Sequence, residues 1–492
     1  MVTKRPRIVI VGAGMAGLTA AHRLRTVAGD LIDLTVLEAG DRLGGRILSS
    51  CFAGDRIEMG ATWIHGIDGS PVHAIAADIG ALSAADSVPY ERMDGFPVDP
   101  VTVAEGGGVV EPSVVDSVSL FYKSLMDSAR EGKVPVTADN NSVGSFLRSG
   151  KGALAADGSG DWTLDAVFAV SENTERTYTS ADDLDDLDLA AESEYKEFGG
   201  DQITIADGYS RVIEHLASAL PEGSIRMNAK VREIEWCRVD GGEGPVRVHV
   251  DGGGREGEEV VVADHVIVTV SLGVLKAGLR KDADAGSVMR FSPGLPGFKR
   301  EAIGRLGFGV VDKLFMEMDG GDEFPYLQLA FKSEGHVEKI PRWMRRTASI
   351  CPIYGGSRVV LAWLAGEEAA EMEELEDGDV IGGVHATLEA FRVGRRVLRV
   401  RRSGWRRNPL FLGSYSYVAL GSSGEDLDLM AEPLPRGGET TMQLLFAGEA
   451  THRTHYSTTH GAYFSGKREA NRLLQYYRCC SGNNNNTSNG CC

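Results

Sequence analysis

The sequence predicts an α/β protein in which a domain built from βαβ units is interleaved with a second, α+β domain. The chain has 492 residues, too many for one simple hydrophobic core. Four apolar residues, Ile8 to Val11, lead into the turn Gly12-Ala-Gly14-Met-Ala-Gly17 and then into helix-forming residues. Two more strand-and-helix patterns occur far along the chain, at about 203–285 and 431–478. Together these observations indicate a discontinuous βαβ domain.

The first glycine motif predicts a phosphate-binding turn. Gly12 permits a tight turn after the strand, Gly14 lets a pyrophosphate approach the backbone, and Gly17 lets the helix pack closely on the strand. A second strand ends at Glu38, whose carboxylate suits the two hydroxyls of an adenosine ribose and would repel the 2′-phosphate of NADP. The alternative is an ordinary glycine turn beside a surface glutamate.

A second glycine motif, AGDRLGGR at residues 39–46, follows Glu38 directly. It looks like the second glycine motif of the glutathione-reductase-like flavoproteins, in which an arginine borders the FAD pyrophosphate. Arg46 can offer several fixed N–H donors to phosphate oxygens. The two motifs therefore predict FAD, bound by a glutathione-reductase-like, Rossmann-type domain, although a surface loop with a solvated arginine is the alternative.

Composition narrows the classes of function. A net charge of −19 without a basic stripe disfavours nucleic acid and favours small polycations as partners. No apolar run is long enough to span a bilayer, no leader is visible, and seven cysteines do not form a disulfide framework. No metal site is expected. We expect a cytoplasmic monomer without a membrane partner, and we interpret the acidic stretch 181–194 as a solvated face rather than a cation-attracting rim.

The expected domain organisation alternates along the chain. The FAD-binding domain takes residues 1–95, 203–285 and 431–478, and the substrate-binding α+β domain takes residues 96–202 and 286–430. The polar, low-complexity segment 479–492 is expected to be a disordered tail.

Eight motifs along the chain resemble, in sequence and in order, those of the flavin-containing amine oxidases, and within that family those of the polyamine oxidases. The forms ATWIHG and YSTTHG look closer to the members that oxidise spermine and thermospermine. The resemblance implies oxidation of a secondary amine to an imine, which water hydrolyses to spermidine and an aminoaldehyde, while O2 is reduced to H2O2 or another acceptor is used. The motifs are IVIVGAGMAG (8–17), LEAGDRLGGR (37–46), EMGATWIHG (58–66), HVIVTVSLGVLK (265–276), GVVDKLFM (309–316), GSYSYVALG (413–421), LLFAGEATH (444–452) and YSTTHGAYFSG (456–466).

The same resemblance implies a set of FAD-binding residues. Val231 would use its backbone on the adenine, and Glu449 would bind toward the ribityl and pyrophosphate groups. The backbone N–H of Thr459, at a helix start, would face flavin O2, where a helix N-terminus stabilises negative charge. FAD is expected to be non-covalent, because no cysteine lies near 445–465. The full set of cofactor-binding residues is Gly12, Gly14, Gly17, Glu38, Arg46, Gly60, Ala61, Thr62, Trp63, Val231, Trp405, Glu449 and Thr459.

Lys313 is the strongest candidate for catalysis. In the strand VVDKLFM, alternation places it on one face with Val311 and Phe315, so it is not an ordinary solvent-facing lysine. The resemblance implies that it holds a water against flavin N5. A strand lysine that reaches solvent is the alternative.

Three more residues are expected at the reacting amine. His65 would line the active site, unless it is a structural histidine. Tyr415 would form one wall of an aromatic sandwich. Thr458 stands where many relatives have the second aromatic residue, so a hydroxyl contact replaces a two-ring cage.

Four other functions compete with this prediction. Monoamine oxidases tether flavin through a cysteine, and histone-lysine demethylases carry additional helical regions that are not visible here. An NAD-dependent reductase and a non-catalytic flavoprotein are the remaining alternatives. An apolar strand face that carries Lys313 disfavours the non-catalytic protein.

Overall fold

A parallel sheet of five strands forms the centre of the first of two bodies in the computed structural model, which describes residues 5–83, 94–137, 140–155, 162–237, 245–251, 258–280, 288–321, 323–332, 340–436 and 442–482. The strand order is β22-β13-β1-β2-β9, so segments from the start, middle and end of the chain meet side by side. The strands are β1 (Arg7–Val11), β2 (Asp33–Leu37), β9 (Ile225–Arg226), β13 (His265–Val268) and β22 (Leu444–Phe446).

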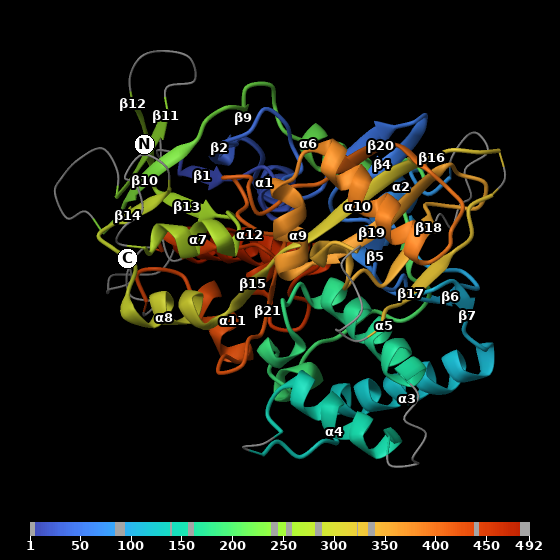
Figure 1. Cartoon of the computed structure of the whole chain (residues 1–492). Coiled ribbons are helices and arrows are strands. Elements are labelled where there is room, and N and C mark those ends of the chain that lie inside the picture. The colour runs from blue at the N-terminus through green and yellow to red at the C-terminus, as the bar shows by residue number, and fades with distance from the viewer. Residues whose placement is uncertain are drawn as a thin grey trace.

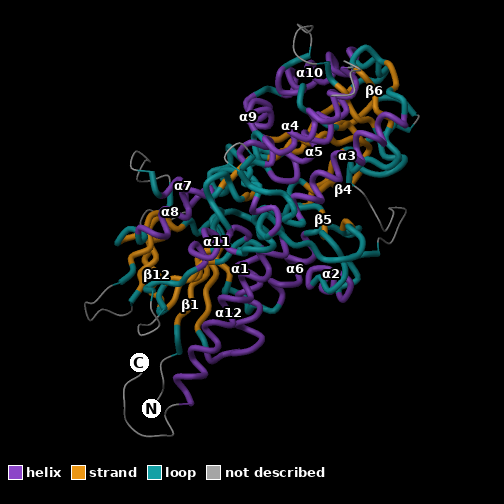
Figure 2. Tube along the Cα trace, turned by 90° about the horizontal axis from the view of Figure 1, so that it is seen from below, coloured by secondary structure: helices purple, strands orange, loops and turns teal. Residues whose placement is uncertain are grey.

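Both faces of this sheet are buried, as a parallel sheet requires. Ile8 and Ile10 of β1 pack in one hydrophobic cluster, and Val9 and Val11 pack in another on the opposite face. Helices α1 (Met15–Ala28) and α12 (Thr459–Gly482) pack against each other beside β1 (Figure 2). The apolar alternation of β1 thus produces a sheet covered on two sides.

A second sheet of four strands, in the order β12-β11-β10-β14, flanks the first. Its strands are β10 (Val231–Glu235), β11 (Val246–Asp251), β12 (Glu258–Ala263) and β14 (Arg290–Ser292). Strand β14 lies beyond the boundary expected at residue 285, and Ile303 of α8 (Gly297–Arg305) packs in the same cluster as Ile234 of β10. Residues 288–305, which were expected in the substrate-binding domain, therefore pack with the first body.

The other body contains a mixed sheet of seven strands in the order β20-β16-β19-β18-β17-β6-β7. Helices α3, α4 and α5 form a separate layer below it in Figure 1, joined by their own hydrophobic cluster. The strands are β6 (Val101–Ala104), β7 (Gly108–Val109), β16 (Val311–Met318), β17 (Leu327–Ala330), β18 (Ser349–Pro352), β19 (Val359–Ala365) and β20 (Val397–Arg402), and the helices are α3 (Pro112–Arg130), α4 (Val143–Ala155) and α5 (Trp162–Thr179).

Shorter elements connect and cover the two bodies. The remaining strands are β3 (Ser49–Phe52), β4 (Asp55–Glu58), β5 (Trp63–Ile64), β8 (Ile203–Thr204), β15 (Gly307–Gly309) and β21 (Tyr415–Tyr417). The remaining helices are α2 (Pro71–Asp78), α6 (Ser210–Ser218), α7 (Leu272–Gly278), α9 (Gly366–Glu374), α10 (Asp377–Ala390) and α11 (Gly424–Ala431).

The tail differs in part from the expectation. Helix α12 continues through Gly482, so residues 479–482 are helical, and residues 483–492 of the expected disordered tail lie outside the described residues. No helix in the described ranges combines the length and apolar character needed to cross a bilayer.

Candidate active site

One large cavity, of about 1190 Å³, brings the predicted site residues together. Pockets for drug-sized ligands typically measure roughly 300–1,000 Å³, so this cavity has room for a dinucleotide and an extended second molecule. Every predicted site residue lines it except Gly17. The lining ones are Gly12, Gly14, Glu38, Arg46, Gly60, Ala61, Thr62, Trp63, His65, Val231, Lys313, Trp405, Tyr415, Glu449, Thr458 and Thr459.

Gly17 lies behind the cavity and has the packing role expected of it. A Cβ on Gly17 would stand 2.0 Å from the carbonyl oxygen of Gly12, so only glycine lets α1 approach β1 this closely. Gly12 itself adopts a φ of +108°, a conformation that other residues rarely take. These two residues place the N-terminus of α1 at the cavity.

The two glycine motifs touch each other. Gly14 forms a parallel bridge with Gly44, and the Gly44 N–H donates to the carbonyl of Ala13 at 2.9 Å. A Cβ on Gly14 would have no neighbouring atom closer than 3.8 Å. Because glycine lacks a Cβ, this space on the cavity wall stays open. This wall, with the α1 N-terminus and Arg46, fits a pyrophosphate.

Glu38 accepts hydrogen bonds from backbone N–H groups of both glycine motifs. Its Oε2 accepts a hydrogen bond from the Ala13 N–H at 2.7 Å, and its Oε1 accepts one from the Gly40 N–H at 2.8 Å. The side chain is buried but lines the cavity. A carboxylate that already orients both turns is well placed to accept ribose hydroxyls, which stays a prediction.

Arg46 and Glu449 form an ion pair across the cavity wall. Nη1 of Arg46 lies 2.9 Å from Oε1 of Glu449 and also donates to the Ser414 carbonyl at 2.8 Å. The other carboxylate oxygen of Glu449 accepts from the Ser416 hydroxyl at 2.5 Å and from the Ser457 N–H at 2.9 Å. The Glu449 carboxylate therefore holds together the second glycine motif, β21 and the residues just before α12.

Lys313 is 2 % exposed and points into the cavity wall from β16. Its Nζ donates to the carbonyl oxygens of Glu58 at 2.6 Å and Gly60 at 2.7 Å, and to the Thr62 hydroxyl. It also lies 4.5 Å from the ring centroid of Trp363. Lys313 thus orders the 58–62 segment, and its contact with a water at flavin N5 stays a prediction.

Tyr415 and Trp405 form aromatic parts of the wall. The Tyr415 hydroxyl donates to the Thr177 carbonyl, and burial raises the pKa of this phenol, which keeps it neutral. Trp405 is buried against Phe411 in an edge-to-face contact, with ring centroids 5.3 Å apart. A Cβ on Gly60 would lie 1.9 Å from the Arg46 carbonyl oxygen and 3.2 Å from the Trp405 ring, so only glycine fits between this backbone and the ring.

Thr458 has a structural contact that the sequence did not predict. Its hydroxyl donates to the His455 carbonyl at 2.7 Å and accepts from the Gly461 N–H at 3.1 Å, so it caps α12. Thr459, the first residue of α12, bonds through its hydroxyl to Tyr209 at 2.5 Å. The predicted hydroxyl contact of Thr458 with substrate would have to share an oxygen already engaged in the cap.

His65 lies at the polar side of the cavity. Its Nδ1 is 3.3 Å from Oε1 of Gln202. Burial lowers the pKa of His65 against the opposing charge of Glu197, so the imidazole is neutral at physiological pH. A neutral imidazole can contact an amine without repelling a cation.

Several residues that line the cavity were not predicted from the sequence. Arg130 of α3 pairs with Glu175 of α5 at 3.0 Å and with Glu192 at 3.8 Å. Glu197 and Asp201 line the same cavity and are exposed. The available signal was weak: Glu175 and Tyr178 are three positions apart, a spacing that places them on one face of α5, and both line the cavity.

The acidic stretch 181–194 divides into two kinds of residue. Asp183 and Asp186 form a capping box on a short 3₁₀ helix, and Asp185 pairs with Arg148 at 2.6 Å. These contacts agree with a solvated face. Glu192 departs from it, because it lines the cavity and burial beside Glu175 raises its pKa to about 7.

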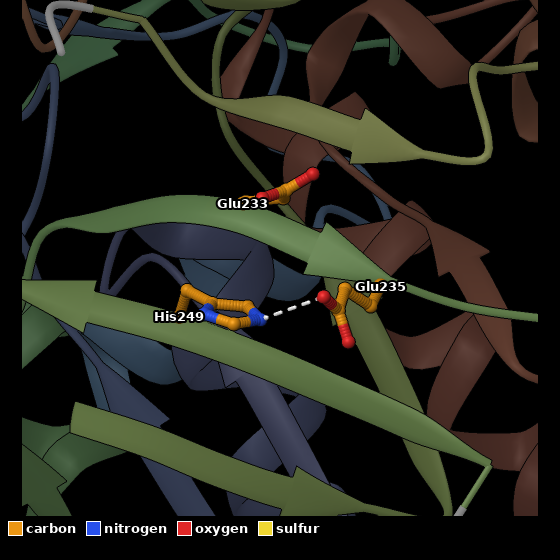
Figure 3. A group of neighbouring side chains, drawn as sticks. All are labelled: Glu233, Glu235 and His249. Carbon is orange, nitrogen blue, oxygen red and sulfur yellow. Dashed lines mark ion pairs between the residues drawn. The ribbon is translucent and has the colours of Figure 1, made fainter. Parts of the chain in front are cut away.

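Sequence reasoning predicted no metal site, yet Glu233, Glu235 and His249 place one potential ligand atom each within 4.8 Å of one another (Figure 3). They lie on one face of β10 and β11, where His249 Nε2 is 3.3 Å from Glu235 Oε1. Arg290 stands in register beside Glu233, and Arg247 beside Glu235. Cationic side chains at these register positions would compete with a metal ion for the carboxylates.

Comparison with known proteins agrees with this arrangement. The family described as flavin containing amine oxidoreductase matches residues 15–474. Polyamine oxidase 1 of Oryza sativa subsp. japonica is 52% identical, with 97% of this chain and 99% of the relative covered. Probable polyamine oxidase 5 of Arabidopsis thaliana is 47% identical, with the same coverage. The peroxisomal N(1)-acetyl-spermine/spermidine oxidase of Homo sapiens is 35% identical, with 96% of this chain and 95% of the relative covered.

The family match covers nearly the whole chain and includes the second glycine motif and Lys313. These matches confirm a flavin as the cofactor, in agreement with the FAD that the glycine motifs predicted, and they contradict an NAD-dependent reductase. The resemblance inferred from the eight motifs is also confirmed. The chain belongs to the flavin containing amine oxidoreductase family.

Proposed function

We propose that this chain is an FAD-dependent polyamine oxidase that oxidises a secondary amine of spermine or thermospermine. The products would be spermidine and an aminoaldehyde, with O2 reduced to H2O2 or another electron acceptor used. One observation supports this proposal above all: both glycine motifs and Lys313 line the same cavity as four carboxylates. These are Glu175, Glu192, Glu197 and Asp201. The names of the relatives support a polyamine as substrate.

The carboxylates suit a substrate with several positive charges. Arg130 already neutralises part of the charge of Glu175 and Glu192, whereas Glu197 and Asp201 face the more exposed side of the cavity. A chain net charge of −19 adds a long-range attraction for polycations. A linear polyamine could hold an outer ammonium group at this side while an inner amine reaches the wall at Tyr415.

When bound, FAD supplies the two-electron acceptor for oxidation of the amine. The chain would hold it at the α1 and α12 N-termini, in a domain that we propose to be glutathione-reductase-like. The apolar wall of Trp405, Trp363 and Tyr415 excludes water, which favours the neutral amine needed for oxidation. Lys313 fixes the 58–62 segment on this wall and would position a water at flavin N5.

Anaerobic reduction of the bound flavin tests the proposal. Spermine or thermospermine should bleach the yellow purified protein, and mass spectrometry of the products should find spermidine and the aminoaldehyde. Bleaching only by monoamines or only by N-methylated lysine peptides would assign a monoamine oxidase-like or demethylase-like function instead. No bleaching by any amine would indicate a non-catalytic flavoprotein.

We further propose that FAD is held without a covalent bond, because no cysteine of the described residues lines the cavity. Acid precipitation should then leave all the flavin in the supernatant, and a yellow washed pellet would contradict this. We also propose a cytoplasmic monomer with no membrane partner. Light scattering after size exclusion and imaging of a tagged chain test these two points.

A further inference from the structure

Asp312 is a fully buried carboxyl group next to Lys313 but on the opposite face of β16. Its Oδ1 accepts from the Ser403 hydroxyl at 2.7 Å and from the Trp405 N–H at 3.3 Å. Its Oδ2 is buried and has no donor among the described residues. A buried carboxylate with an unsatisfied oxygen is costly, so the contacts of Oδ2 need an explanation.

Glu373, at the end of α9, is the group that faces Asp312. It is 5 % exposed, and its two oxygens accept from the backbone N–H groups of Arg406 and Arg407, each at 2.8 Å. Asp312 accepts from the N–H of Trp405, and Glu373 accepts from the N–H groups of Arg406 and Arg407, so the two buried carboxyl groups bind consecutive amides of one turn. Two ionised carboxyl groups cannot hydrogen-bond to each other, because neither has a donor until one of them is protonated.

The charges around the pair favour a single negative charge. Arg402 bonds to the carbonyl oxygens of Met372 and Leu375, and Arg407 to the carbonyl oxygen of Glu373. The Lys313 ammonium points away, to the 58–62 segment, and Tyr415 is an uncharged neighbour. Within the described part of the chain, neither carboxyl has an ion-pair partner. Burial first, and then the adjoining Glu373, raise the pKa of Asp312 well above its ordinary value.

We propose that Asp312 and Glu373 share one proton, and that this carboxylic acid–carboxylate pair positions residues 403–407 and thereby Trp405 on the cavity wall. The Ser403 hydroxyl that donates to Asp312 also accepts from the Lys313 N–H at 2.8 Å. The pair therefore connects α9, the Trp405 turn and the strand that carries Lys313. Asp312 is a positioning residue, and its role does not depend on which amine is oxidised.

Asp312→Asn and Asp312→Ala separate this role from simple packing. Asparagine keeps an acceptor for Ser403 and supplies a permanent donor to Glu373, so D312N should retain bound flavin and, at about pH 4, a melting temperature close to that of the wild type. Alanine leaves Ser403, Trp405 and Glu373 without their partner, so D312A should lose bound flavin. Its melting temperature should fall by on the order of 5 °C.

The pH dependence gives a readout that packing alone would not move. When folding raises the pKa of a carboxyl group, the group stabilises the folded state fully at pH values below its unfolded-state pKa. This stabilisation is lost as the pH rises through the folded-state pKa. The wild type should therefore lose stability relative to D312N as the pH rises above about 4, the ordinary pKa of an aspartate. Glu317→Gln is the matched control, because Glu317 is buried on the same strand but ion-paired with Arg399 at 2.6 Å.

The expected result is a melting-temperature difference, D312N minus wild type, that grows with pH, while the E317Q difference stays level. The infrared spectrum should also contain the C=O stretch of a protonated carboxylic acid that is missing in D312N. A level D312N difference, flavin loss or misfolding in D312N comparable with D312A, or no such infrared band in the wild type would each overturn the shared proton.

Discussion

Arg46 and Glu449 are 403 positions apart in the sequence, yet their side chains meet at 2.9 Å on the wall of the cavity. Both were predicted to face the FAD pyrophosphate region, one as a donor and the other as an acceptor. The ion pair explains how opposite charges can border the same group, because each side chain orients the other. The Glu449 side chain is only 6% exposed, and Arg46 and the donors from Ser416 and Ser457 compensate for the water that it lacks.

We expect Glu449→Gln to weaken flavin retention by at least about tenfold in Kd, since a charge-assisted hydrogen bond contributes roughly 1.5–3 kcal/mol. The glutamine keeps the size of the side chain but cannot neutralise Arg46 or accept at both ends. Flavin titration of the apoprotein measures the change. Glu425→Gln, an exposed residue of α11, is the control. An E449Q protein that binds flavin as tightly as this control would remove Glu449 from the cofactor site.

Glu38→Ala should also weaken FAD retention, for two reasons. Two ribose hydroxyls lose a charged acceptor, and the N–H groups of Ala13 and Gly40 lose the carboxylate that orders both glycine motifs. The loss is roughly 1.5–3 kcal/mol for one charged hydrogen bond. Glu38→Gln keeps one acceptor oxygen and should be intermediate. Full flavin occupancy of E38A after dilution and dialysis would show that the assignment is wrong.

Glu192 should make the KM for a polyamine depend on pH. With its pKa raised to about 7, its carboxylate is negative above that pH and becomes neutral as the pH falls through it. The KM for spermine should therefore rise on acidification, with little change in kcat. Glu192→Gln should show the raised KM at every pH, with a flatter profile.

The matched control for Glu192 is Asp185→Asn, in the same acidic stretch but paired with Arg148. It should leave the KM profile as in the wild type. If the E192Q and D185N profiles coincide, Glu192 does not contribute to binding the substrate cation.

Local patterns predicted residues that meet in one cavity where they lie in contiguous motifs. The turn from Gly12 to Gly17 and the position of Lys313 follow from backbone geometry and strand alternation, and Gly12, Gly14 and Lys313 line the same cavity. The acidic half escaped prediction, because Arg130, Glu175 and Glu192 come from three separate segments. Nothing in a single stretch of sequence distinguishes Glu192 from the solvated carboxylates beside it.

For the same reason, the sequence did not predict the capping role of Thr458. Its motif position suggested a substrate contact, and only the structure shows that its hydroxyl caps α12. Likewise, strand alternation placed Lys313 correctly but could not identify its acceptors, which belong to a segment about 250 residues earlier.

The central prediction concerns Lys313→Met. Methionine keeps length and apolar packing but removes every donor, so FAD should stay bound and the fold should survive. The carbonyl oxygens of Glu58 and Gly60 lose their donor, which should lower the stability by about 1–3 kcal/mol. Flavin reduction by spermine or thermospermine, or flavin reoxidation, should slow substantially, since general acid–base roles contribute on the order of 10²–10⁴-fold. Stopped-flow absorbance resolves the two half-reactions.

Lys299→Met separates the chemical effect of Lys313→Met from its effect on stability. Lys299 is also fully buried, and its Nζ donates to the carbonyl oxygens of Leu429, Met430 and Glu432 at 2.7–3.0 Å, but it does not line the cavity. K299M should be destabilised to a similar degree without a change in either half-reaction. If both rates of K313M stay within about threefold of the wild type, as those of K299M should, then Lys313 only holds the 58–62 segment in place, and its catalytic assignment is wrong.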